Sequence, residues 1–167
     1  MTSRSGQYVI PAMHAIEGAG FHVRRPFPTP NLPMVDPFLL LDHMGPQDHA
    51  PGEAEGAPDH PHRGFETVSY ILEGELEHED SAGHRGALGA GDVQWMTAGA
   101  GIVHAEMFPL LNHEGPNTAE LFQIWLNLPK AEKFATPHFS MLWSEDVPIV
   151  VERDIAGRST EITVAAG

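Results

Sequence analysis

The stretch that decides the fold covers residues 58–107 and reads PDHPHRGFETVSYILEGELEHEDSAGHRGALGAGDVQWMTAGAGIVHAEM. Apolar and polar side chains alternate along it in short runs, and turns that contain glycine separate those runs. Residues 67–72 and 75–80 both show the period of two that a half-buried strand requires. Residues 81–84 (SAGH) then predict a tight turn that folds residues 85–88 back as the second strand of a hairpin.

The same pattern continues outside this stretch. Residues 93–96 and 102–108 predict two more strands, and residues 149–152 and 161–165 predict a last hairpin. Residues 121–128 (LFQIWLNL) predict a buried strand, although a two-turn helix is also compatible with so short an apolar run. Many short strands between regular turns indicate an all-β sandwich or a small barrel.

Composition excludes several classes of protein. The chain has 167 residues, which is enough for one domain, and its 9 Lys and Arg against 23 Asp and Glu give a net charge of −14. Such a surface repels phosphate, so we expect no direct nucleic-acid partner and no membrane partner. Cysteine is absent, which removes disulfides and thiolate ligands, and no apolar run approaches the ~20 residues of a membrane span. We expect a cytoplasmic protein.

Two pairs of potential metal ligands have strand spacing. His60 and His62 flank a proline just before one predicted strand, and His104 and Glu106 lie within another. Residues i and i+2 of a strand point to the same face and lie ~6.6 Å apart. If the two segments face each other across a barrel, three imidazoles and one carboxylate converge. Nitrogen and oxygen donors of this kind suit Fe(II), Mn(II), Ni(II) or Cu(II), and Zn(II) is compatible.

Spacing alone leaves a second interpretation open. His104 and Glu106 share a strand face with Ile102 and Phe108, so they are expected to be buried beside apolar side chains. Burying both polar groups is costly unless each has a partner. A metal ion is one such partner, and a plain hydrogen bond between the imidazole and the carboxylate is the other.

Other residues receive secondary expectations. His78 and His84 flank the predicted hairpin and are expected at the surface. Gly99 and Gly101 are expected to allow a close backbone approach or a bulge next to the second ligand pair. Phe38 and Phe65 are candidates for the mouth of a pocket.

Longer strings carry a more specific signal. HPHRGFET (residues 60–67), QWMTAG followed by GIVHAE (residues 94–106), VDPFLLLDHMGP (residues 35–46) and LFQIWLNLP (residues 121–129) together strongly resemble the N-terminal half of the pirin family, within the cupin superfamily. The resemblance implies a cupin jelly-roll barrel that holds a single metal ion, usually iron. The residues at the ligand positions of the family are His60, His62, His104 and Glu106.

The resemblance also implies a domain organisation. We expect residues 1–167 to form one pirin-like N-terminal cupin domain without the second cupin half of the family, either as a single-domain relative or as a truncated product. Within this domain we expect an arm and edge strands in residues 1–55, the metal-binding core in residues 56–129, and a connector and final hairpin in residues 130–167. Loss of the second half would expose one flank of the barrel, so self-association is an expectation too.

Two functions follow from the resemblance. Some pirins have quercetin 2,3-dioxygenase activity, which opens the central ring of a flavonol with O2 and releases carbon monoxide. The expected partners are then a small aromatic, flavonol-like substrate and O2, with Glu106 as the general base that takes the substrate hydroxyl proton. The alternative is a non-catalytic, iron-binding and redox-responsive regulator that acts through protein partners.

Overall fold

A computed structural model describes residues 9–18, 20–52 and 55–166. Every regular element among these residues is a β-strand, and the described residues contain no helix that is long and apolar enough to cross a membrane. The strands are β1 (Met13–Glu17), β2 (Phe21–Phe27), β3 (Phe38–His49), β4 (Glu55–His62), β5 (Phe65–Glu73), β6 (Leu76–Asp80), β7 (Arg85–Leu88), β8 (Val93–Thr97), β9 (Ile102–Phe108), β10 (Asn117–Asn127), β11 (His138–Leu142), β12 (Ile149–Arg153) and β13 (Ser159–Thr163).

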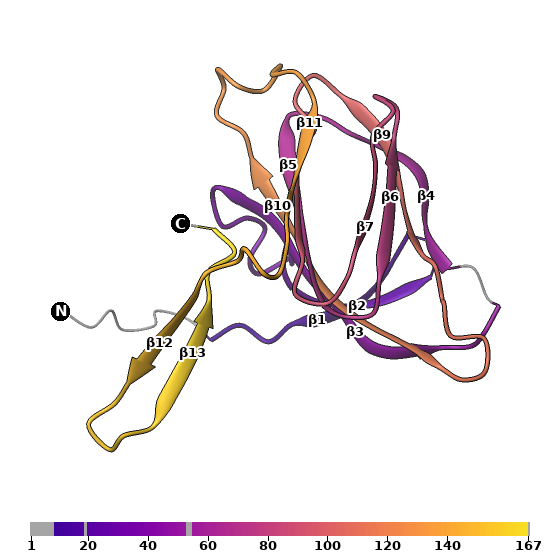
Figure 1. Cartoon of the computed structure of the whole chain (residues 1–167). Helices are drawn as coiled ribbons and strands as arrows, with labels where there is room; N and C mark the ends of the chain where they lie inside the picture. Colours follow the sequence, from indigo (N-terminus) through magenta and orange to yellow (C-terminus); the bar gives the residue numbers. More distant parts are fainter. Residues whose placement is uncertain (1–8, 19, 53–54, 167) are drawn as a thin grey trace.

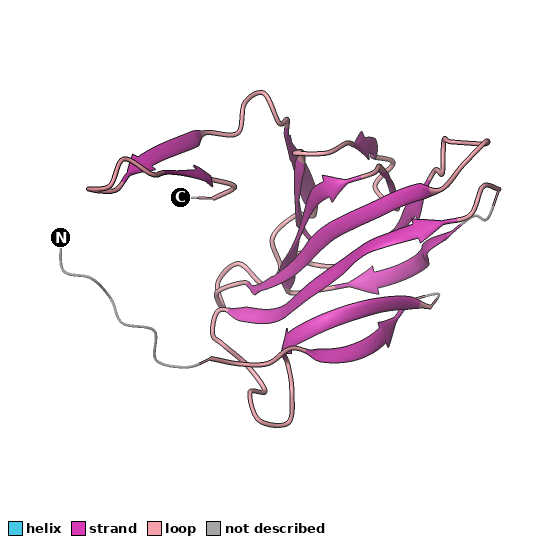
Figure 2. Cartoon of the chain, turned by 90° about the horizontal axis from the view of Figure 1, so that it is seen from below, coloured by secondary structure: helices cyan, strands magenta, loops and turns pink. Residues whose placement is uncertain are grey.

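Two sheets form the body of the molecule. The larger has seven strands in the order β1-β2-β3-β10-β5-β8-β11, and the smaller has four in the order β4-β9-β6-β7. The two sheets face each other in Figure 1, and Figure 2 shows the long strands of the larger sheet side by side. Strands β12 and β13 pair only with each other and project as a separate hairpin (Figure 1). The expected all-β architecture is confirmed.

The period-two segments are strands where the sequence predicts them. Residues 67–72 lie within β5, and the predicted hairpin is formed by β6 and β7. Along β6 the side chains of Leu76, His78 and Asp80 are buried, whereas Glu77 and Glu79 are exposed. Residues 121–128 fall largely in β10, which settles the choice between strand and helix in favour of a strand.

The two ends of the chain contribute more to the large sheet than expected. Strand β3, from the predicted arm and edge region, lies between β2 and β10 and is twelve residues long. Strand β11 lies within the predicted connector and forms an edge of the same sheet by pairing with β8. Residues 1–8, included in that arm, lie outside the described residues.

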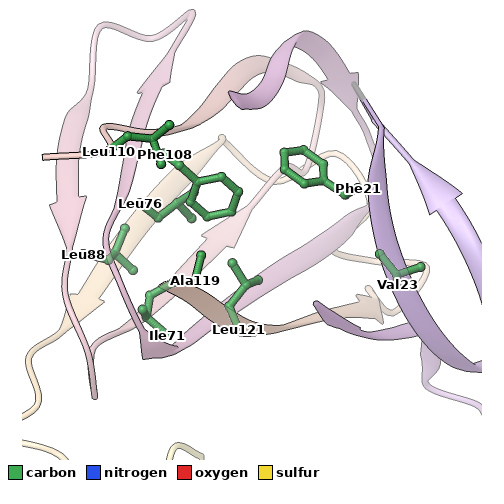
Figure 3. Packing of buried hydrophobic residues seen from close by; sticks show 9 residues of the cluster. All are labelled: Phe21, Val23, Ile71, Leu76, Leu88, Phe108, Leu110, Ala119 and Leu121. Atoms are coloured by element: carbon green, nitrogen blue, oxygen red, sulfur yellow. The ribbon is translucent and has the colours of Figure 1, made fainter. Parts of the chain in front are cut away.

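A cluster of apolar side chains joins the two sheets. Phe21 from β2 meets Phe108 from β9 edge to face, with ring centroids 5.4 Å apart. Figure 3 shows the side chains of this cluster converging between the strands. Its buried members are Phe21, Val23, Ile71, Leu76, Leu88, Phe108, Leu110, Ala119 and Leu121. Burial of this apolar surface is the main favourable contribution to the free energy of folding.

The turn before β9 depends on a close backbone approach. Gly99 has a φ of +46°, and a Cβ at this position would overlap the carbonyl oxygen of Ala135. The same carbonyl accepts a hydrogen bond of 2.8 Å from the Ala100 amide, so the turn is fastened to the segment that precedes β11. The expected close approach is therefore present. The irregularity of register next to the ligand pairs lies instead in β4, between Ala57 and His60.

Truncating the core should cost stability in a position-dependent way. Leu88 is 1% exposed, so L88A should lower the free energy of unfolding by about 2–5 kcal/mol because it leaves a cavity. Ile162 on the projecting hairpin is 46% exposed, and I162A should cost less than about 1 kcal/mol. Urea denaturation followed by circular dichroism measures both changes. Equal losses would contradict the assignment of the core.

Candidate metal centre

Two neighbouring strands of the small sheet carry the predicted histidines. His60 and His62 lie at the end of β4, and His104 lies in the middle of β9. The strands pair antiparallel with His60 directly opposite His104. The expectation that the two segments face each other across a barrel was wrong. They are adjacent strands, and direct pairing brings their side chains together on one face of the sheet.

The three imidazoles form a compact cluster. One ring nitrogen from each of His60, His62 and His104 lies within 4.8 Å of the other two. The ring centroids are 4.7 Å apart for His60 and His62, 4.4 Å for His60 and His104, and 4.8 Å for His62 and His104. His104 is fully buried and His62 is nearly so, whereas His60 is partly exposed.

Electrostatics keep the buried members of this cluster neutral. Burial, together with repulsion from His60, lowers the pKa of His62 to about 4. Burial and the neighbouring imidazoles lower the pKa of His104 to about 2. At neutral pH both rings are therefore uncharged, and a neutral imidazole offers a lone pair to a metal ion.

Hydrogen bonds indicate which nitrogens are available. The Nδ1 of His60 lies 2.8 Å from the carbonyl oxygen of Pro58, and because a carbonyl only accepts, Nδ1 carries the ring proton. Its Nε2 then keeps a lone pair. The Nε2 of His104 is buried and has no hydrogen-bond partner among the described residues. Three converging imidazoles, of which His104 has an unpartnered buried nitrogen, fit a divalent cation.

Glu106 lies two residues beyond His104 on β9 and lines the same cavity as His60 and His62. Its carboxylate is not part of the compact cluster of three imidazoles. The Oε1 atom instead accepts a hydrogen bond of 3.0 Å from the hydroxyl of Ser69 on β5. Burial raises the pKa of Glu106, whereas the Ser69 hydrogen bond opposes that shift. A carboxyl group with a raised pKa is well suited to accept and return a proton.

Ser69 connects Glu106 to the larger sheet. Its hydroxyl oxygen lies 2.9 Å from the Oε1 of Gln123 on β10 as well as 3.0 Å from Glu106. A hydroxyl group has one proton, so it donates to only one of these two acceptors at a time. Gln123 also lines the cavity. The row Glu106, Ser69 and Gln123 therefore crosses from one sheet to the other beside the cluster.

A cavity of about 580 Å³ opens in front of His60, His62 and Glu106. Both sheets line it, mostly with apolar side chains. Phe21, Phe65, Phe108 and Trp125 all contribute to its wall. The ring centroids of Phe65 and Trp125 are 4.8 Å apart, with an angle of 31° between the rings. Phe65 lines the cavity as expected, but Phe38 is not among its lining residues.

An ion pair forms another part of the cavity wall. The guanidinium of Arg25 donates to both carboxylate oxygens of Asp42, at 2.7 Å from Nε and 2.5 Å from Nη2, and Nη1 lies 2.7 Å from Glu17. Burial raises the pKa of Asp42, whereas Arg25 acts in the opposite direction. The bidentate geometry compensates the cost of burying this carboxylate beside the apolar lining.

The sequence did not predict that several of these side chains lie at the site. His78 was expected at the surface, and this expectation was wrong, because His78 is 2% exposed and lies against His104. The alternation of β6 already contained the signal, since His78 shares the face of Leu76 and Asp80. Ser69 and Gln123 carry no such signal, because only the pairing of β5 with β10 brings them together.

Comparison with known proteins places the chain in a family. The family model described as Pirin matches residues 20–126, which is more than half of the chain. The chain belongs to the pirin family. It is similar to a pirin-like protein of Solanum lycopersicum, with 45% identity over 151 residues that cover 90% of this chain and 47% of the relative. The pirin of Rattus norvegicus is 51% identical over 133 residues, covering 79% of this chain and 42% of that protein.

Solved structures confirm the cupin fold of this pirin. A quercetin 2,3-dioxygenase from Acinetobacter baumannii is 38% identical with a TM-score of 0.78, covering 90% of this chain and 52% of that one. A bacterial pirin from Escherichia coli, solved in complex with nickel(II), is 29% identical with a TM-score of 0.63, covering 78% of this chain and 54% of that one. This pirin spans about half the length of the curated relatives it matches.

The depressed pKa of His62 predicts a specific dependence of stability on pH. Below pH 6.5 the unfolded chain protonates this imidazole, whereas the folded chain resists protonation down to about pH 4. The free energy of unfolding should therefore fall through this window, by about 3 kcal/mol from His62 alone.

Urea denaturation of the chelator-treated protein between pH 7 and pH 4 measures this dependence. H62Q should have a shallower slope than the wild type, because it lacks the titrating group. H22Q, which removes an exposed imidazole from β2, is the matched control and should keep the wild-type slope. If the free energy of unfolding of H62Q fell with pH as steeply as that of the wild type, the conclusion that His62 is buried and uncharged would be contradicted.

Proposed function

We propose that this pirin binds one divalent metal ion, Fe(II) in its active form, and opens flavonols such as quercetin with O2 as a quercetin 2,3-dioxygenase. The observation that carries this proposal is the position of the imidazole cluster. His60 and His62 lie on the wall of the cavity, with His104 behind them, and burial lowers the pKa of His62 and of His104, so that these two rings are uncharged at neutral pH.

The metal ligands in this proposal are His60, His62, His104 and Glu106. Three imidazoles and one carboxylate are nitrogen and oxygen donors that suit first-row divalent ions. A related bacterial pirin was solved in complex with nickel(II), which supports the binding of a divalent metal ion by this chain. Glu106 would hold the metal together with the three imidazoles, and its carboxylate would act as a base when it is not bound to the metal.

The cavity supports a flat aromatic substrate. Its volume of about 580 Å³ falls within the ~300–1,000 Å³ of small-molecule sites. Phe65 and Trp125 offer ring surfaces against which a flavonol can pack. Gln123 and the Arg25–Asp42 ion pair supply hydrogen-bonding groups in the wall, and these can orient the hydroxyl groups of the substrate.

The proposed chemistry divides between the ion and the protein. A divalent ion at this site supplies Lewis acidity that lowers the pKa of a hydroxyl group held next to it. Glu106 accepts the hydroxyl proton at a carboxylate oxygen, since burial raises its pKa. When the carboxylate of Glu106 is not bound to the metal, the hydroxyl of Ser69 donates a hydrogen bond to its Oε1. The apolar lining keeps water away from the reacting ring.

Metal content is the direct test of the ligand set. Protein purified without added metal and then loaded with Fe(II) should contain one equivalent by elemental analysis. H60A/H62A should lose the metal, because it removes two of the three imidazoles while leaving the buried His104 in place. Full occupancy in that double variant would contradict the proposed centre.

The role of Glu106 can be tested in the iron-loaded protein with quercetin under air. E106Q should lower turnover by about 10²–10⁴-fold, since removal of a general base has an effect of that size. E120Q is the matched control, because Glu120 is a partly buried carboxyl group that bonds His43 outside the cavity.

If E106Q retains metal and wild-type turnover, Glu106 is not the base. If the wild type shows no flavonol-dependent O2 uptake, the dioxygenase assignment fails and a regulatory role is favoured.

A further inference from the structure

A fourth imidazole, that of His78, lies next to the cluster of His60, His62 and His104 and has no role in the proposed chemistry. His78 is on β6, which pairs with β9 on the side opposite to β4. Its side chain is fully buried, and its Nδ1 lies 3.3 Å from the Nδ1 of His104. Two ring nitrogens at this distance share one proton, so one of them donates and the other accepts.

The far side of His78 meets a carboxylate. Its Nε2 lies 3.4 Å from the Oδ2 of Asp80, whose side chain is also fully buried. The hairpin turn holds Asp80 in place, because its Oδ1 accepts hydrogen bonds from the backbone amides of Ala82, at 2.8 Å, and His84, at 3.1 Å. The His84 ring nitrogen Nδ1 lies 2.9 Å from Oδ2. Although burial raises the pKa of Asp80, these hydrogen bonds outweigh it and hold the pKa below its usual value.

The contacts from Asp80 through His78 to His104 determine which ring nitrogens donate and which accept a hydrogen bond. An ionised carboxylate only accepts, so the Nε2 of His78 donates to Asp80. A neutral imidazole has one ring proton, which leaves the Nδ1 of His78 as an acceptor. The Nδ1 of His104 must then donate to it, and the lone pair of His104 is on Nε2. That atom is the buried nitrogen without a hydrogen-bond partner among the described residues.

We propose that His78 and Asp80 are a positioning pair that holds His104 in its Nδ1-protonated form and presents its Nε2 to the metal. This inference rests on the proposed metal centre. Neither residue touches the metal or the substrate. The pair orients one ligand, as an outer hydrogen-bonding partner of a metal-binding imidazole does.

The arrangement parallels that of the opposite ligand strand. On β4 the carbonyl of Pro58 accepts the Nδ1 proton of His60 and leaves its Nε2 available. On β9 the neighbouring backbone groups take part in strand pairing, so a side chain from β6 provides the acceptor for His104. Two of the three imidazoles are therefore held with Nε2 available before any ion binds.

The tautomer of His104 can be measured in the metal-free protein. Nitrogen-15 chemical shifts of the imidazoles distinguish Nδ1–H from Nε2–H, and H104Q identifies the signals of this residue. We expect the Nδ1–H tautomer in the wild type. D80N places an amide donor opposite the Nε2 of His78, which moves the proton of His78 to Nδ1 and that of His104 to Nε2. A wild-type His104 in the Nε2–H form, or no change of tautomer in D80N, would overturn the proposal.

Metal affinity gives an independent readout. H78F keeps a ring of similar size but has no acceptor, and it should weaken Ni(II) binding by about 10–100-fold in competition with a chelator. H78N retains an acceptor near the position of Nδ1 and should recover part of that loss. H43F is the matched control, because it removes a partly buried imidazole that bonds Glu120 outside the cavity.

The outcomes separate this inference from the proposed function. A folded H78F that binds Ni(II) as tightly as the wild type would overturn the positioning role. If H78F does not fold, D80N and its tautomer decide the question. If the wild type binds no metal although His104 is in the Nδ1–H form, the metal centre fails while the hydrogen-bonded row stands.

Discussion

The pairing of β4 with β9 is the constraint on which the proposed centre depends. It sets His60 opposite His104, and the alternation along β4 then brings His62 to the same face. A shift of this register by one residue would turn His104 away from the cluster and bring the exposed Val103 in its place. The pairing of β4 with β9 shifts in register between Ala57 and His60, next to the His60–His104 pair. The end of β4 that carries the histidines is therefore paired with β9 in a different register from the rest of the strand.

Holding neutral imidazoles in an apolar interior has a cost that the surrounding structure offsets. Burial depresses the pKa of His62 and His104, which reflects the unfavourable free energy of charging either ring there. The apolar cluster around Phe21 and Phe108 provides favourable burial next to the cavity. Hydrophobic burial elsewhere in the fold thus offsets the cost of keeping these imidazoles in the interior, where the proposed cation would satisfy them.

The cavity brings together groups from both sheets in separate roles. The small sheet supplies His60, His62 and Glu106, and the large sheet supplies Gln123, Phe65, Trp125 and the Arg25–Asp42 ion pair. The proposed ligands therefore lie on paired strands of one sheet, and the groups proposed to face the substrate lie on the opposite sheet. Changes in the large sheet can therefore alter the fit of a substrate while the donor cluster stays intact.

The sequence by itself determined the strands of residues 65–108 and the identity of the candidate donors, because period-two alternation and the i, i+2 spacing of His60, His62, His104 and Glu106 are local properties of the chain. The pirin strings carried the family and the fold. Only the tertiary structure decided that β4 and β9 are neighbours rather than opposite walls, that Glu106 bonds Ser69, and that His78 is buried behind His104. These facts depend on which strands pair and in what register, and that choice is made by burial and hydrogen bonding between segments far apart in sequence.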